Sequence, residues 1–170
     1  MHITAKVDYA LRAAAELAAA EPGRYVKGEA IAAAQGMPLR FVENILGGLA
    51  HAGLLESQRG SEGGYRLARP ASGISLADVI RAVEGPLATV RGTVPEAIDY
   101  HGHARVLRDV WFAVRANLRA VAEHVTLADL AAGTIPEPIA EIAANPDARE
   151  HRRAPDGRVR PPRARRSQRA

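Results

Sequence analysis

The sequence predicts a mainly α-helical fold with one small β-hairpin. Three segments with helical spacing precede Gly53, and a tight turn separates the second from the third. Two short extended segments then flank a glycine-rich loop, and a long apolar stripe with helical spacing follows at about 104–125. The order helix, helix, turn, helix and hairpin is that of a winged helix-turn-helix. We therefore expect a winged helix-turn-helix at 1–86, followed by a long dimerisation helix.

Composition limits the classes of protein to which the chain can belong. Its 170 residues allow one domain with an accessory element, and the 47% of hydrophobic residues can supply a core although aromatic residues are only 4%. The sequence contains no cysteine, which excludes a disulfide framework, a thiolate nucleophile and a cysteine-ligated iron–sulfur cluster. It has no apolar run that could span a bilayer and no secretory signal pattern, so we expect a cytoplasmic protein without membrane contact.

The net charge of +4 is distributed unevenly. After position 144 there are nine arginines and three acidic residues, a net charge of +6, so residues 1–144 carry −2. Bulk charge is therefore weak support for nucleic-acid binding, and the case rests on local patterning. We expect the Pro- and Arg-rich end, 133–170, to be disordered. It either adds nonspecific DNA affinity or has no role beyond solubility.

The three N-terminal helices are predicted from apolar spacing and from the residues at their ends. Thr4 is a suitable N-cap for the first helix, which Pro22-Gly23 ends. The second helix, 29–35, ends at Gly36 because glycine suits the left-handed position after a helix. Pro38 fits the first position of the third helix. The inner face of that third helix is expected to hold six residues: Phe41, Val42, Ile45, Leu46, Leu49 and Ala52.

The predicted wing is a hairpin of two strands, 54–59 and 65–69, around a loop at 60–64. Glycine gives this loop access to positive φ at several points, so the tip can adapt to a surface. Ser75 and Asp78 have the spacing of a capping box and start a fourth helix behind the hairpin.

A long amphipathic helix is predicted beyond the aperiodic segment 87–102, which we expect to be a mobile loop. The apolar stripe of this helix has no partner left in so small a domain, so pairing with a second copy is the simplest way to bury it. Trp111 lies on the stripe and is either core or the floor of a small-ligand pocket. Thr126 caps a short final helix, which completes a dimerisation unit at 103–132. The residues expected at the dimer interface are Leu107, Val110, Trp111, Val114, Leu118, Val121 and Val125.

The third helix and the wing hold the candidate DNA-reading side chains. Arg40, Glu43 and Asn44 supply donors and acceptors for guanine, cytosine and adenine edges in the major groove. Arg59 precedes the flexible loop, where it suits a narrow minor groove, and two further arginines follow the loop. Two lysines near helix starts suit phosphate contacts. The full candidate set is Lys6, Lys27, Pro38, Leu39, Arg40, Glu43, Asn44, Arg59, Gly60, Ser61, Gly63, Gly64 and Tyr65.

Several of these segments together resemble one family of bacterial regulators. The segments are 8–13, 38–46, 52–60, 63–70, 74–80 with Glu84-Gly85, Trp111, and 126–130. They resemble the Rrf2 family, which includes the IscR, NsrR and CymR types, and the similarity covers about residues 1–132. The resemblance implies a homodimeric winged-helix transcription factor, usually a repressor, that reads a roughly palindromic operator in double-stranded DNA. It implies that the third helix enters the major groove and the wing the minor groove.

The chain departs from that family at the loop before the long helix. Many members carry three cysteines there to hold an iron–sulfur cluster, and the corresponding positions fall near Thr93, Asp99 and Arg105. We therefore expect no such cofactor. His101 and His103 are weak candidates for metal binding, and a metal, a small molecule or a partner protein could act as effector. The alternative to a DNA-reading regulator is a helix-turn-helix that serves as a protein-interaction module, and no motif indicates an enzyme.

Overall fold

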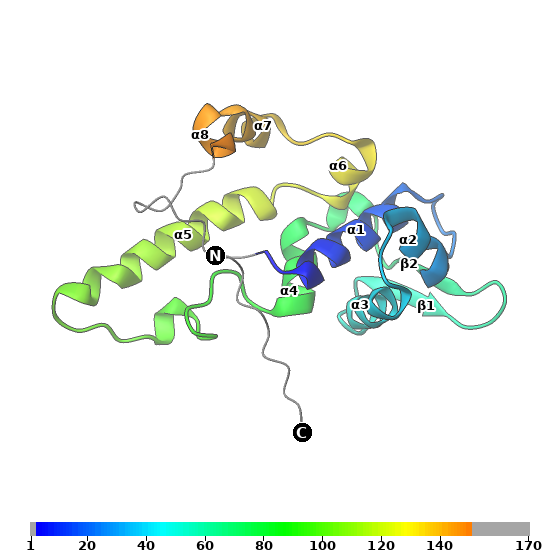
Figure 1. Ribbon diagram of the computed structural model, residues 1–170, viewed down its shortest axis with the longest axis horizontal. Helices are drawn as coiled ribbons and strands as arrows, with labels where there is room; N and C mark the ends of the chain where they lie inside the picture. Colours follow the sequence, from blue (N-terminus) through cyan, green and yellow to red (C-terminus); the bar gives the residue numbers. More distant parts are fainter. Residues whose placement is uncertain (1–2, 151–170) are drawn as a thin grey trace, which may run out of the picture. The chain divides into compact units, whose positions relative to one another are not determined.

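The computed structural model describes residues 3–150. Three helices and a hairpin form its N-terminal part (Figure 1). The helices are α1 (Ala5–Ala19), α2 (Gly28–Gln35) and α3 (Leu39–His51), and the antiparallel strands are β1 (Leu55–Gln58) and β2 (Gly64–Leu67). The predicted winged helix-turn-helix order is therefore confirmed.

Local chemistry sets the ends of these helices. The hydroxyl of Thr4 accepts a hydrogen bond from the amide of Val7 at 3.2 Å, so the predicted N-cap of α1 is present. Gly36 follows α2 with φ of 61°, in the left-handed conformation that glycine adopts at low cost. Pro38 is the N-cap of α3 rather than its first helical residue, a difference of one position from the prediction.

A third extended segment supports the wing. The amide and carbonyl of Val26 exchange hydrogen bonds of 2.9 Å with those of Tyr65, beside the β1–β2 pair that runs in register from Leu55 opposite Leu67. Gly64 has φ of 150°, and a Cβ there would collide with the Val26 carbonyl. Only glycine fits at this position, so the wing is joined tightly to the segment before α2.

The core lies among α1, α3, α4 (Leu76–Glu84) and α6 (Leu127–Ala132). Alanines on one face of α1 let α4 and α6 approach closely. Large aliphatic side chains from α2, α3 and the later helices fill the rest, as the low aromatic content predicted. The fully buried members include Ile31, Ile45, Leu46, Leu49, Ile74 and Leu127.

Two capping boxes start α4 and α6 next to each other. Ser75 with Asp78, and Thr126 with Asp129, each exchange side-chain and main-chain hydrogen bonds across the first turn. The amide of Leu76 donates to the Val125 carbonyl at 2.9 Å. The segment after the long helix is thus fixed to the N-terminal helices at the start of α4.

The long helix is shorter than predicted. A short 3₁₀ segment, η3 (Gly102–Val106), precedes α5 (Leu107–Ala122), which extends away from the helix-turn-helix (Figure 1). Val125 follows the helix and is only 3% exposed, packed in the core. Its predicted place in a dimer interface is therefore wrong, because helical spacing continues past the point where the helix ends.

The segment 87–102, predicted to be a mobile loop, contains local structure and buried residues. It contains a 3₁₀ turn, η2 (Pro95–Ala97), and buries Pro95 and Ile98. Apolar burial within an aperiodic segment leaves no periodic signal in the sequence, which explains the difference.

Residues from Glu137 onward belong to a second unit. It contains α7 (Glu137–Ala144) and α8 (Pro146–Arg149), where disorder was predicted for 133–170. Alanine and glutamate, with Pro138 in the first turn, favour a helix in this stretch despite the charged, Pro-rich context. The remainder of the predicted tail, 151–170, lies outside the described residues. Within residues 3–150, no helix is long and apolar enough to cross a membrane.

Candidate nucleic-acid interface

One face of α3 is buried and the opposite face is open. Val42, Ile45, Leu46 and Leu49 face the core, as predicted. The predicted DNA-reading residues on the other side are all exposed: Pro38, Leu39, Arg40, Glu43 and Asn44. The side chains of Arg40 and Asn44 have no hydrogen-bond or ion-pair partner among the described residues, so their donors and acceptors are available to a ligand.

Two of the residues assigned to the inner face of α3 lie elsewhere. Ala52 is exposed after the end of the helix, and Phe41 is 39% exposed. The ring of Phe41 packs edge-on against Tyr9 of α1, with centroids 5.4 Å apart and planes at 88°. The apolar spacing placed Phe41 in the core, but its true neighbour is a partly buried tyrosine at the rim.

Contacts from α1 hold both sides of the turn between α2 and α3. Arg12 Nε donates to the side-chain oxygen of Gln35 at 3.0 Å, and Nη2 donates to the main-chain carbonyl of the same residue at the end of α2. The Arg12 guanidinium also lies 5.5 Å from the centroid of the Tyr9 ring, which contacts Phe41 in the first turn of α3. The start of α3 is thus fixed from α1. This role of Arg12 was not predicted, because its partner is 23 residues away.

The wing places one free arginine before its tip. Gly63 N donates to Gly60 O at 3.0 Å, which closes the turn of the loop. Arg59 and Ser61 are exposed, and the Arg59 side chain has no partner within residues 3–150. Gly63 is buried and Gly64 and Tyr65 are half-buried, so these three shape the base of the wing rather than its contact surface.

The two arginines that follow the loop have partners within the chain. Arg66 makes hydrogen bonds of 2.9 and 2.6 Å to Glu56 on the opposite strand, and its guanidinium lies 4.7 Å from the Tyr25 ring centroid. The Glu56 carboxylate raises the pKa of Arg66. Arg69 bonds to Asp78 at 3.1 Å and to the Gly73 carbonyl at 2.9 Å. Both side chains hold the hairpin in place, which leaves Arg59 as the wing arginine without a partner among residues 3–150.

The structure brings six of the predicted DNA-contact residues around one hollow. This open cavity of about 330 Å³ lies between the first turn of α2, the exposed side of α3 and the base of the wing. The six are Lys27, Glu43, Gly60, Gly63, Gly64 and Tyr65. Lys6 lies apart from them, because its ammonium donates to the Val83 carbonyl at 2.7 Å near the end of α4. The geometry gives Lys6 a role in helix packing in place of the predicted phosphate contact.

The stripe of α5 is largely uncovered in a single chain. No residue of α5 is buried, and Val110 is 46% exposed. An open apolar groove runs along one side of the helix, lined by Val110, Ala113, Val114, Asn117 and Leu118. Leu107, Trp111 and Val121 are half-buried. The Trp111 indole donates to the hydroxyl of Tyr100 at 3.0 Å, so this side chain packs against the loop at 87–102.

Ion pairs attach the same loop to α5. Arg115 Nη1 donates to Glu96 at 2.9 Å, and its second terminal nitrogen also bonds that carboxylate. This pair lowers the pKa of Glu96 to about 2. Arg108 donates to Asp99 at 3.0 Å and to the Ile98 carbonyl at 3.1 Å. The loop is therefore fastened along the helix by side chains of opposite charge.

Comparison with known proteins decides the family. Residues 3–133 match the family model Rrf2, described as an iron-dependent transcriptional regulator. The chain belongs to the Rrf2 family. Its DNA-reading candidates, Arg40, Glu43, Asn44 and Arg59, all fall inside the matched segment.

Relatives of this Rrf2 chain are named as transcriptional regulators. An HTH-type regulator from Mycobacterium tuberculosis is 47% identical over 153 residues, covering 90% of this chain and 95% of the relative. The solved structure of CymR, the global cysteine regulator of B. subtilis, has a TM-score of 0.67 at 29% identity and covers 79% of this chain and 98% of CymR. IscR of T. potens has a TM-score of 0.61 at 28% identity, covering 89% and 93%. The Rrf2 chain is thus a DNA-binding transcriptional regulator and not an enzyme.

The iron in the family's description does not fit the residues of this Rrf2 chain. The sequence has no cysteine, and the positions near Thr93, Asp99 and Arg105 offer no thiolate. His101 and His103 are exposed, and between residues 3 and 150 no three His, Asp or Glu side chains are grouped as a metal would require. Asp99 instead pairs with Arg108.

Proposed function

We propose that this Rrf2 regulator binds duplex DNA as a homodimer and represses transcription from a roughly palindromic operator. The observation that carries the proposal is the open face of α3, where Arg40 and Asn44 stand unpaired on a helix that α1 holds at its start. Polar side chains on a rigidly positioned helix can read base edges because they need no reorganisation to bind.

Each exposed side chain has a chemical role at the groove. Arg40 donates two hydrogen bonds to a guanine edge or grips a phosphate, Glu43 accepts from cytosine, and Asn44 pairs with adenine. Leu39 supplies an apolar contact for a thymine methyl group. Arg59, at the wing, enters a narrow minor groove, whose negative potential favours a guanidinium.

The uncovered stripe of α5 supports the dimer. Val110, Val114 and Leu118 line an apolar groove in a single chain, and burying such a stripe against a second copy stabilises both. A two-fold axis between paired α5 helices gives two copies of α3 and two wings, and the operator then repeats with inverted symmetry. A small molecule or partner protein that favours one dimer geometry would act as effector.

A selection from random duplexes with the full chain tests the proposal. The expected result is an enriched inverted repeat, bound with steep salt dependence. Arg40→Ala and Arg59→Ala should each weaken binding to that site by about 1–3 kcal/mol. Arg105→Ala, which removes an exposed arginine before α5, is the matched control and should bind as the parent does. Equal affinity for all sequences would instead favour a protein-interaction module.

A further inference from the structure

We propose that Arg81 of α4 is a positioning residue that sets the angle between α5 and the helix-turn-helix, and through it the spacing between operator half-sites that a dimer accepts. The Arg81 guanidinium pairs with the carboxylate of Glu123, the residue that follows α5. The effect on the angle concerns a single chain, whereas the effect on operator spacing rests on the dimeric DNA-binding function proposed above.

Main-chain hydrogen bonds attach α5 to the N-terminal helices at one end. The amide of Leu76 donates to the Val125 carbonyl at 2.9 Å. The amide of Leu127 donates to the Ile74 carbonyl at the same distance. Together they fix the point where the chain leaves α5. Bonds gathered at one end of a helix leave its direction free to change, so the angle of α5 depends on a second contact.

The loop at 87–102 does not supply that second contact. Among the described residues, the side-chain hydrogen bonds that join this loop to another element all involve α5, where Arg108, Trp111 and Arg115 are the donors. Ile98 of the loop is buried but lies outside the core cluster of the N-terminal helices. The loop is therefore fastened to α5 and follows that helix.

Arg81 supplies the contact from the side of α4. Its guanidinium bonds to the Glu123 carboxylate at the end of α5, and no other side-chain hydrogen bond or ion pair joins α4 to α5 within residues 3–150. A second terminal nitrogen of Arg81 lies 3.8 Å from Asp78, one turn earlier on α4. Because Asp78 also caps α4, this carboxylate holds the guanidinium in the direction of Glu123.

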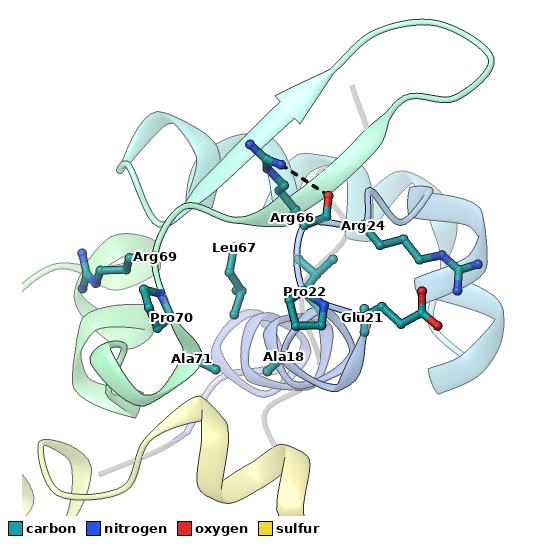
Figure 2. A pocket seen from close by; sticks show the side chains of 12 residues that line it. Ala18, Glu21, Pro22, Arg24, Arg66, Leu67, Arg69, Pro70 and Ala71 are labelled. Atoms are coloured by element: carbon teal, nitrogen blue, oxygen red, sulfur yellow. Dashed lines mark hydrogen bonds between the residues drawn. The ribbon is translucent and has the colours of Figure 1, made fainter.

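The same ion-pair chain continues to the wing. Arg69, which follows β2, donates to Asp78 at 3.1 Å. Figure 2 shows the Arg69 side chain directed away from the cavity between the end of α1 and β2. Alternating charges thus run from the hairpin through Asp78 and Arg81 to Glu123. Each exposed pair alone contributes little to stability, but shared partners at Asp78 and Arg81 restrict the geometry of the whole chain of charges.

A small change of angle is large on the scale of DNA. At 1.5 Å per residue, the 16 residues of α5 span about 24 Å. A rotation of about 8° at the attached end moves the other end by about 3.4 Å, the rise of one base pair. In the proposed dimer the paired α5 helices stay together, so the same rotation displaces α3 and the wing of each copy. A dimer with a fixed angle therefore selects one half-site spacing.

Operator spacing tests the role of Arg81 in the full chain. The probes are the inverted repeat selected by the parent and versions with one base pair added to or removed from the spacer. The parent should prefer its own spacing at least tenfold. Arg81→Gln and Glu123→Gln should each reduce that preference by about threefold, and the double variant no further. Base preferences within a half-site should not change, because α3 is unaltered.

Arg119→Gln is the matched control. It removes an equal charge and an ion pair to the same Glu123, at 3.8 Å, but that pair stays next to α5 and does not reach α4. Its spacing preference should equal that of the parent. An equal loss in this variant would overturn the proposal, since it would show an effect of charge alone.

Spin labels measure the angle without DNA. The chain has no cysteine, so Ala52→Cys and Asp109→Cys, at exposed positions after α3 and in α5, provide two unique labelling sites. Dilution with unlabelled chain leaves only distances within one copy. Double electron–electron resonance should give a narrow distance distribution in the parent and with Arg119→Gln. The distribution should broaden with Arg81→Gln.

An unbroadened distribution with Arg81→Gln would overturn the role of Arg81 in setting the angle. An unchanged spacing preference, or a loss of affinity equal for all three spacers, would overturn its role in operator choice. Glu123→Gln decides both points if Arg81→Gln does not fold, as seen by circular dichroism. Failure of the proposed function shows separately, as a parent chain that enriches no inverted repeat while its label distances still report the angle.

Discussion

Gly47→Ala is expected to stabilise the protein while weakening its binding to DNA. Gly47 lies in the interior of α3, and a Cβ at this position would meet no atom within 4 Å. Glycine inside a helix costs about 0.8–1 kcal/mol relative to alanine. Nothing in the folded chain requires glycine at position 47, because no atom occupies the place of an added methyl group. The substitution should therefore raise the free energy of unfolding by about 0.8 kcal/mol and the melting temperature by about 3 °C.

The effect on the affinity for DNA has the opposite sign because Gly47 lies on the exposed side of α3. It lies one helical turn after Asn44 and two after Arg40, on the same exposed face. If that face meets the major groove, an added methyl group holds α3 away from the base edges. Loss of one two-bond base contact costs about 1–3 kcal/mol, or roughly 5- to 150-fold in affinity for the selected operator.

Gly48→Ala is the matched control for this prediction. Its Cβ position is equally open, so its gain in stability should be similar. It lies two turns after Phe41, on the flank of α3 toward α1, so operator affinity should fall less. Thermal unfolding and fluorescence anisotropy with a labelled operator measure the two effects. Parental affinity in Gly47→Ala would show that this face does not approach DNA and would refute the reasoning.

Three further predictions test other parts of the structure. Gly64→Ala should lower the free energy of unfolding by about 2–4 kcal/mol in a denaturant titration, because its Cβ meets the Val26 carbonyl; Gly73→Ala, where the position is open, should change it little, and equal losses in both would contradict the close approach. The pKa of Glu96 is lowered to about 2, so its contribution to holding the 87–102 loop is present above the ordinary value of 4.5 and is lost as the pH falls toward 2. The protection factors of the loop amides, which correct for the pH dependence of intrinsic exchange, should fall over that range, and Glu96→Gln should show low protection at every pH; protection in that variant equal to the parent at neutral pH would refute the ion-pair role. Val110→Asp should give a folded monomer by light scattering, whereas Val125→Ala should stay dimeric but lose about 2 kcal/mol of stability; a dimeric Val110→Asp would exclude the α5 stripe as the interface.

The features that were predicted correctly depend on residues close together in the chain. The cap at Thr4, the left-handed Gly36 and the box formed by Ser75 and Asp78 each involve at most four successive residues, so their chemistry is readable without a fold. Helical spacing likewise found the buried face of α3. The exposure of Arg40 and Asn44 could then be predicted, because both lie on the side of α3 opposite to its buried face.

The errors concern contacts between residues distant in the chain. Spacing assigned Phe41 to the core and Val125 to the outer stripe, but Tyr9 and the start of α4 decide their surroundings. Nothing in the sequence distinguished Arg66 from the other wing arginines, because its partner Glu56 becomes a neighbour only when the two strands pair. Apolar pattern predicts that a residue is buried somewhere, and only the tertiary arrangement says against what.

Some basic side chains are paired with carboxylates and others are not, and this difference explains how residues 1–144, with a net charge of −2, can present a surface to DNA. Arg66 and Arg69 are paired with carboxylates, and their charges cancel locally while fixing the hairpin. Lys27, Arg40 and Arg59 have no such partner among the described residues, and all three lie around α3 and the wing. Potential near a surface depends on unpaired charges within about a Debye length rather than on the total. Glu56 and Asp78 thus hold the hairpin, and Lys27, Arg40 and Arg59 remain available where the groove would lie, beside the exposed carboxylates of Glu29 and Glu43.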